Sequence, residues 1–148
     1  MSTSEKTPFE SGVPDAEAGY SGSMAPSSPP TTLTTDNPRQ ARQVLARQMS
    51  QWGLDHLSGD VELIVSELVT NATQHAGGVR SIAITARDGY IRVEVADPDP
   101  TPPSLRSPGT GENSGRGLLL VAALSRAWGV RPEGDGKVVW AEVRTDED

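Results

Sequence analysis

The feature that most constrains the fold is the longest helical pattern in the chain. It begins at Ser58 or Asp60 and ends at Gly77. Its apolar residues recur at the spacing of a helix that buries one face, at Val61, Ile64, Val65, Leu68 and Ala72. Glu67 and Asn71 lie about 40° apart at the edge of that face. Because a polar group beside a buried face is costly unless it has a partner, the pair indicates a functional site.

Residues 1–31 differ in composition from the rest of the chain. They are rich in Ser, Thr, Pro and Gly and nearly lack aliphatic side chains. Such a segment cannot bury enough apolar area to offset the entropy lost on ordering. The near absence of aliphatic side chains from residues 1–31 also explains why hydrophobic residues make up only 34% of the 148-residue chain. We therefore expect a disordered tail over residues 1–31 and one globular domain over residues 32–145.

Charge and composition exclude several classes of function. The formal net charge of −7 argues against nucleic-acid binding, because a phosphate backbone would be repelled. The absence of cysteine excludes disulfides and thiolate metal sites. No stretch approaches the roughly 18 apolar residues of a membrane span, and Met1 is not followed by the apolar core of a secretory signal. We expect a cytoplasmic protein without a membrane partner.

The order of predicted elements indicates an α+β fold. Asp88-Gly89 and the glycines around Asp135 mark turns within two β-hairpins, and Lys137 is predicted to be a surface residue at the second turn. Strands in hairpin pairs with helices between the pairs favour a two-layer sandwich, with a mostly antiparallel mixed sheet and helices on one face. The predicted elements are an extended piece over 31–35, helices over 38–52, 58–76 and 117–124 or 126, and strands over 81–86, 91–95, 127–131 and 137–143.

Three features in this domain could build a nucleotide site. Asn71 can hold a hydrated Mg²⁺, and Glu67 can orient or deprotonate a nucleophile. Asp97, at the end of a strand, can accept a hydrogen bond from an exocyclic amine. The glycines of residues 115–117 precede a helix, whose free N–H groups attract phosphate. Each feature alone is common on solvated helix edges and turns, but the three together in this order are specific.

These motifs resemble the GHKL superfamily of ATPases. More narrowly, the chain resembles the single-domain histidine-kinase-like ATPases related to bacterial anti-sigma factor serine kinases. The resemblance covers about residues 32–144 and implies a Bergerat-type ATP-binding fold. It rests on residues 67–76 (ELVTNATQHA, the N box), 97–103 (DPDPTPP, in place of the first glycine-bearing box), 115–121 (GRGLLLV, the second glycine box), and 128–129 and 136–140 (the closing strands).

The resemblance also implies roles for individual residues. Asn71 would coordinate Mg²⁺ bridging the ATP phosphates, Glu67 would be the catalytic carboxylate, and Asp97 would bind the adenine amine. His75 matches a family position and would be packed or near the phosphates rather than a metal ligand. Residues 98–114 would form a lid. The triphosphate would be lined by Gly115, Arg116, Gly117 and Leu118.

The loop after Asp97 departs from the family pattern. The family usually has Gly or Ser two residues after the adenine-binding Asp, whereas this chain has Asp99 between Pro98 and Pro100. A second carboxylate near the base and phosphates would repel an anionic nucleotide, with partial screening if it is exposed.

Two functions therefore remain open. The first is an Mg-ATP-dependent serine/threonine protein kinase that regulates transcription, phosphorylating an anti-sigma-factor antagonist of the STAS type and sequestering a sigma factor. The second is a non-catalytic partner-binding regulator that uses the same fold with weak or lost ATPase activity. A detached histidine-kinase catalytic domain is disfavoured, because no second helical hairpin carries a phosphoacceptor and His56 lies in a predicted loop. A homodimer could form through the first helix or the N-terminal strand.

Overall fold

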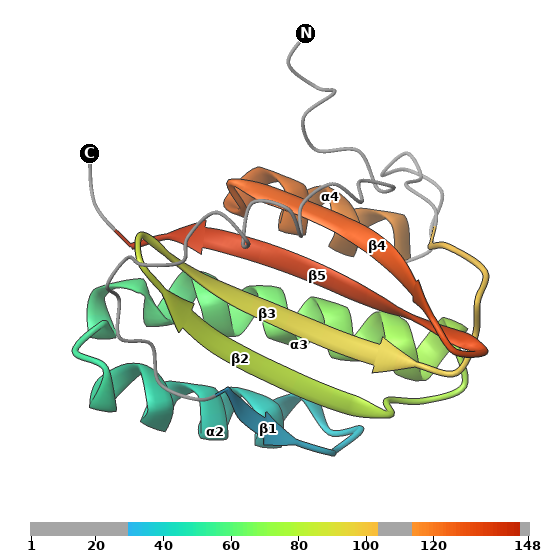
Figure 1. The fold of residues 1–148 in the computed structure, drawn as a ribbon, viewed down its shortest axis with the longest axis horizontal. Coiled ribbons are helices and arrows are strands. Elements are labelled where there is room, and N and C mark those ends of the chain that lie inside the picture. The colour runs from blue at the N-terminus through green and yellow to red at the C-terminus, as the bar shows by residue number, and fades with distance from the viewer. Residues whose placement is uncertain (1–29, 104–113, 146–148) are drawn as a thin grey trace, which may run out of the picture.

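The computed structural model describes residues 30–103 and 114–145, with the backbone alone for residues 114–116. In the described part, five strands form one sheet in the order β1-β2-β3-β5-β4. Residues 1–29 of the predicted tail and most of the predicted lid lie outside the described residues, whereas Thr31, the last residue of the predicted tail, begins β1. Figure 1 shows α2, α3 and α4 on one side of this sheet. The predicted α+β two-layer sandwich is confirmed, and all four strand pairings are antiparallel.

The two predicted hairpins form the centre and one edge of the sheet. Gly89 and Gly134 occupy their turns at φ 97° and 61°, a region that L side chains rarely adopt. In the pairing of β3 with β5, Asp97 lies opposite Lys137. The strands are β1 (Thr31–Leu33), β2 (Ser81–Arg87), β3 (Tyr90–Asp97), β4 (Ala127–Glu133) and β5 (Gly136–Arg144).

The helices begin close to where the sequence predicts them. The first is α2 (Pro38–Gln51), and the Asn37 side chain caps it by accepting hydrogen bonds from the backbone N–H of Arg39 and Gln40 at 2.9 and 3.2 Å. The other two are α3 (Ser58–His75) and α4 (Ser114–Leu124). A 3-10 helix that was not predicted, η2 (Asp55–Leu57), leads into α3, so His56 lies in a short helix rather than a loop.

The hydrophobic core lies between the helices and one face of the sheet. The whole predicted stripe of α3 is buried, and it packs against the alternate residues of β3 that include Val93 and Val95. Leu45 and Met49 of α2 are also fully buried. None of the helices in the described part of the chain has both the length and the hydropathy needed to cross a bilayer.

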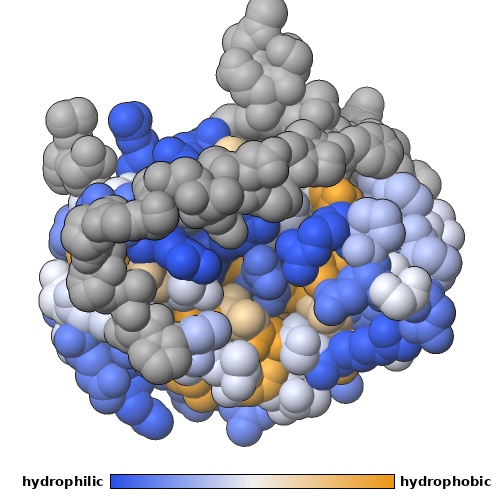
Figure 2. Space-filling view, in the orientation of Figure 1, coloured by the Kyte–Doolittle hydropathy of each residue, from blue (hydrophilic) through white to orange (hydrophobic). Residues whose placement is uncertain are grey.

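The opposite face of the sheet carries a network of charged side chains. Arg92 of β3 donates to Glu142 of β5 at 2.6 Å and to Glu94 at 2.8 Å. Its guanidinium also lies 4.4 Å from the ring centroid of Trp140. Figure 2, viewed from this side, shows hydrophilic residues interspersed with apolar ones. Arg92 and Glu142 are 5% and 2% exposed, so this ion pair is part of the folded structure rather than a solvated surface pair.

Candidate functional site

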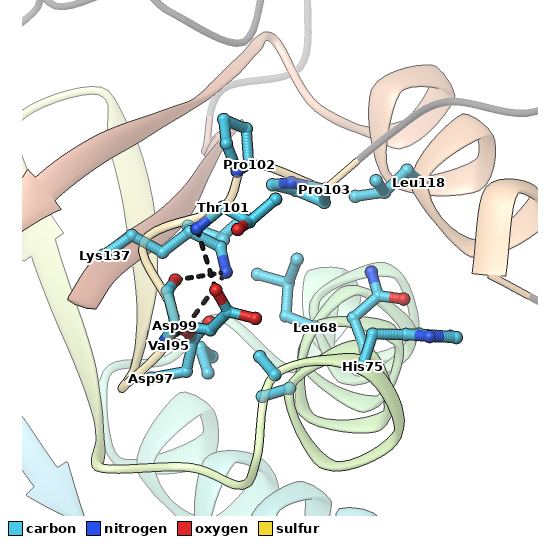
Figure 3. Close-up of a pocket in the computed structure, with 14 residues that line it drawn as sticks. Leu68, His75, Val95, Asp97, Asp99, Thr101, Pro102, Pro103, Leu118 and Lys137 are labelled. Carbon is cyan, nitrogen blue, oxygen red and sulfur yellow. Dashed lines mark hydrogen bonds and ion pairs between the residues drawn. The ribbon is translucent and has the colours of Figure 1, made fainter.

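A cavity of about 190 Å³ lies between α3, the paired ends of β3 and β5, and the start of the 98–103 loop. Figure 3 shows its walls, with His75 on α3, Asp97 at the end of β3 and Leu118 on α4. The cavity brings together four predicted site residues: Asn71, His75, Asp97 and Leu118. They come from three elements that are far apart in the sequence, as the predicted nucleotide site requires.

Helix α3 forms one wall of the cavity. Leu68, Asn71 and His75 follow one another along one side of the helix and all line the space. The side-chain amide nitrogen of Asn71 is buried and has no hydrogen-bond partner among the described residues. Buried polar atoms are nearly always paired, so this orphaned N–H donor points to a ligand that carries a hydrogen-bond acceptor at Asn71. His75 is exposed and lies at the rim of the cavity, not in the core.

Glu67 lies at the junction of α3 and α4 rather than in the cavity lining. A Cβ atom added to Gly117 would collide with the Glu67 carboxylate oxygen. The backbone of the first turn of α4 therefore approaches Glu67 as closely as it can. Burial raises the pKa of Glu67 above that of an ordinary carboxyl group. A carboxylate with a raised pKa is better suited to accept a proton near neutral pH.

Gly117→Ala is expected to displace the Glu67 carboxylate without unfolding the protein. Alanine favours a helix by about 0.5–1 kcal/mol over glycine, and the colliding atom is the end of a flexible side chain. We expect an unchanged or higher melting temperature, while any reaction that depends on Glu67 slows by up to about 100-fold. Gly59→Ala is the matched control, because a Cβ there has no neighbour within 4 Å. Equal activity in both variants would contradict a role for this close approach.

The prediction that Lys137 is a surface residue at a turn is wrong. Lys137 is only 4% exposed and lines the cavity. Its Nζ donates to Asp97 Oδ1 at 3.1 Å and to the Asp99 backbone carbonyl at 2.9 Å. The physical reason is the strand alternation, in which Lys137 shares the helix-facing side of β5 with Val139 and Ala141. That alternation was visible in the sequence and could have placed the lysine inside.

Asp97 is held in place before any ligand binds. It is 2% exposed, and its Oδ1 also accepts from the Asp99 backbone N–H at 2.9 Å. A hydrogen bond from the Thr101 backbone N–H at 2.9 Å, aided by the charge of Lys137, lowers the pKa of Asp99. Asp99 therefore keeps its negative charge, as the sequence predicts. The ammonium of Lys137 lies between the two carboxylate-bearing residues and offsets part of that charge (Figure 3).

The second glycine box opens α4. Gly115, Arg116 and Gly117 lie in its first turn, where backbone N–H groups have no partner within the helix. Thr101, Pro102 and Pro103 of the predicted lid line the cavity, and the rest of that loop lies outside the described residues. No cluster of three or more acidic or histidine side chains that could hold a metal occurs in the described ranges. A magnesium ion at Asn71 would therefore take most of its ligands from phosphate and water.

Comparison with known proteins identifies the family. The profile of the histidine kinase-like ATPase domain matches residues 31–143, so the chain belongs to that family of ATP-binding domains. An uncharacterized protein of Streptomyces coelicolor, SCO4941, is 39% identical over 85 residues, which cover 53% of this chain and 79% of that protein.

The fold is also shared with a solved structure. The chain resembles the crystal structure of the RsbU and RsbW domains of Rv1364c from Mycobacterium tuberculosis, with a TM-score of 0.60 and 21% identity. The match covers 82% of this chain but only 34% of that one, so the chain spans about a third of that protein's length. The similarity shows a common fold, in agreement with the predicted resemblance to GHKL ATPases.

Proposed function

We propose that this protein is an Mg-ATP-dependent serine/threonine protein kinase that acts as an anti-sigma regulator. The observation that carries the proposal is the buried, unpartnered amide of Asn71, which lines a cavity that also holds Asp97 and Leu118. Family membership supplies ATP as the ligand class. The protein substrate would be an anti-sigma-factor antagonist, and the sequestered partner a sigma factor.

The residues of the site suit a phosphoryl transfer. The free oxygen of the Asp97 carboxylate would accept from the adenine amine, and the first turn of α4 would receive the phosphates. The carboxamide oxygen of Asn71 would hold Mg²⁺, which supplies positive charge to neutralise the phosphates when bound. Glu67 would take the proton from a serine hydroxyl as its oxygen attacks the γ-phosphorus, while the bond from that phosphorus to the β–γ bridging oxygen breaks and ADP leaves. Catalysis in this scheme is positioning plus charge stabilisation.

Asn71→Ala is expected to weaken Mg-ATP binding by at least about tenfold, because a metal ligand is lost. Isothermal titration calorimetry of the full chain measures the change. Gln74→Ala is the matched control, since it removes an exposed amide from the same helix. Repeating the titrations with EDTA separates a metal ligand from a direct contact between Asn71 and ATP. If Asn71 acts through the metal, the difference in ATP affinity between wild type and Asn71→Ala should shrink when the metal is removed. Equal Mg-ATP affinity in wild type and Asn71→Ala would contradict the assignment.

A non-catalytic regulator on the same fold is the second candidate. The ionised Asp99 at the cavity favours it, since this carboxylate opposes an anionic nucleotide. Incubation with labelled ATP and candidate antagonist proteins distinguishes the two functions. Label transferred to a partner serine supports the kinase, whereas stable partner binding without transfer supports the binding module.

A further inference from the structure

We propose that Lys137 is a base-reading residue that donates a hydrogen bond to ring nitrogen N1 of adenine. The inference rests on the proposed ATP binding and extends it to how the base is selected. The pairing of β3 with β5 places Lys137 opposite Asp97 in the register. Both side chains line the cavity and are almost fully buried. The cavity therefore presents a donor beside an acceptor.

Among the described residues, the hydrogen bonds of Lys137 leave one of its donors for a ligand. An ammonium group has three N–H bonds. One is donated to Asp97 Oδ1 and one to the Asp99 backbone carbonyl. Figure 3 shows both interactions at the same end of the lysine, on the side where it meets the other cavity residues. The third N–H is then the group that an incoming base can pair with.

The order of the two groups matches adenine. Adenine presents an amine donor on C6 and an adjacent acceptor at N1, and an enzyme pocket reads such an edge by hydrogen bonds. Asp97 Oδ1 is already used by Lys137 and the Asp99 N–H, which leaves the other carboxylate oxygen for the amine. Guanine has the opposite polarity at these two positions, with a carbonyl oxygen on C6 and a donor at N1. With the C6 substituent oriented to Asp97, adenine is therefore the one of the two purines that satisfies both protein groups.

A purely structural role for Lys137 would also explain its burial, because a buried charge needs a partner. The test must therefore measure the contact between Lys137 and the base rather than the stability of the fold. ATP and 1-deaza-ATP differ only in replacing N1 by C–H, so the C6 amine is retained. We expect calorimetry to show wild type binding Mg-ATP roughly tenfold to a hundredfold more tightly than Mg-1-deaza-ATP. A site in which nothing contacts N1 would give equal affinities.

Substitution of the lysine completes the comparison. Lys137→Met keeps the length of the side chain but removes the donor, and we expect this variant to bind the two nucleotides with equal affinity. Arg80→Met is the matched control, because Arg80 pairs with Asp135 at 2.7 Å on the exposed surface, and its preference for ATP should remain. If Lys137→Met does not fold, the Asp97→Asn/Lys137→Met double variant removes both buried charges and should also lose the preference.

The outcomes separate this inference from the proposed function. If wild type binds ATP and 1-deaza-ATP equally, the inference is overturned while ATP binding stands. If Lys137→Met keeps the wild-type preference for ATP, the inference is again overturned, because another group reads N1. If wild type binds neither nucleotide, the proposed function fails, and the inference fails with it. If no variant folds, equal wild-type affinities for the two nucleotides still overturn the inference.

Discussion

Glu67→Gln is expected to slow phosphoryl transfer to a partner serine by roughly 10²–10⁴-fold, the usual contribution of a general base. Glutamine keeps the shape of the side chain beside Gly117 but cannot accept the proton. Mg-ATP affinity should stay close to that of wild type, because Glu67 does not line the cavity. Single-turnover transfer of labelled phosphate measures the rate, and calorimetry measures the affinity. Glu62→Gln on the same helix is the matched control.

The pH dependence of the transfer rate provides a second test of Glu67 as the base. Burial raises the pKa of Glu67, so the transfer rate in wild type should fall as pH drops through that raised value and the base becomes protonated. In Glu67→Gln the residual rate should lack this inflection. The folded state also disfavours the ionised carboxylate, so removing its charge should raise the melting temperature at neutral pH. Undiminished transfer in Glu67→Gln would contradict the assignment of Glu67 as the base.

Glu142→Ala is expected to lower the free energy of unfolding by about 1.5–3 kcal/mol, the contribution of a hydrogen bond to a charged group, because Arg92 keeps Glu94 as a partner. Glu142 is 2% exposed and accepts from Arg92 at 2.6 Å and from Arg126 Nη2 at 3.0 Å. Most of the cost comes from Arg92, because its own side chain is 5% exposed whereas that of Arg126 is 41% exposed. Urea denaturation measures the change.

A surface ion pair supplies the control for Glu142. Asp135→Ala removes the partner of Arg80, and the two side chains are 82% and 45% exposed. Such solvent-exposed pairs contribute little to stability, so we expect hardly any change in the free energy of unfolding. If Glu142→Ala destabilised the protein no more than Asp135→Ala does, the charged network on the open face of the sheet would have no structural role.

The sequence was most informative where local chemistry decides the structure. Asn37-Pro38 marks the start of α2, Asp88-Gly89 marks a hairpin turn, and the apolar stripe of α3 marks its buried face. These features follow from backbone conformation and from a 3.6-residue period. The same period places Asn71 and His75 on one side of α3, which is why both line the cavity.

The remaining features depend on contacts between distant residues. Strand alternation could have placed Lys137 on the buried face, but its pairing with Asp97, 40 positions earlier in the chain, could not be predicted from the local pattern. The Arg92–Glu142 pair joins residues 50 positions apart. Such pairs follow from strand register. Hydrophobic alternation specifies which residues face the core, but it specifies the pairing on the open face of the sheet less strongly. The Glu67–Gly117 approach likewise depends on the packing of α3 against α4.

The central claim is that ATP binds in the cavity between α3 and the ends of β3 and β5. A titration of the full chain with Mg-ATP, followed by backbone amide chemical shifts, tests this claim most directly. We predict saturable binding at one site, with the largest shifts in residues 68–76, 95–103 and 117–118. Absence of saturable binding, or shifts concentrated around Arg92 and Glu142 on the opposite face of the sheet, would contradict the account.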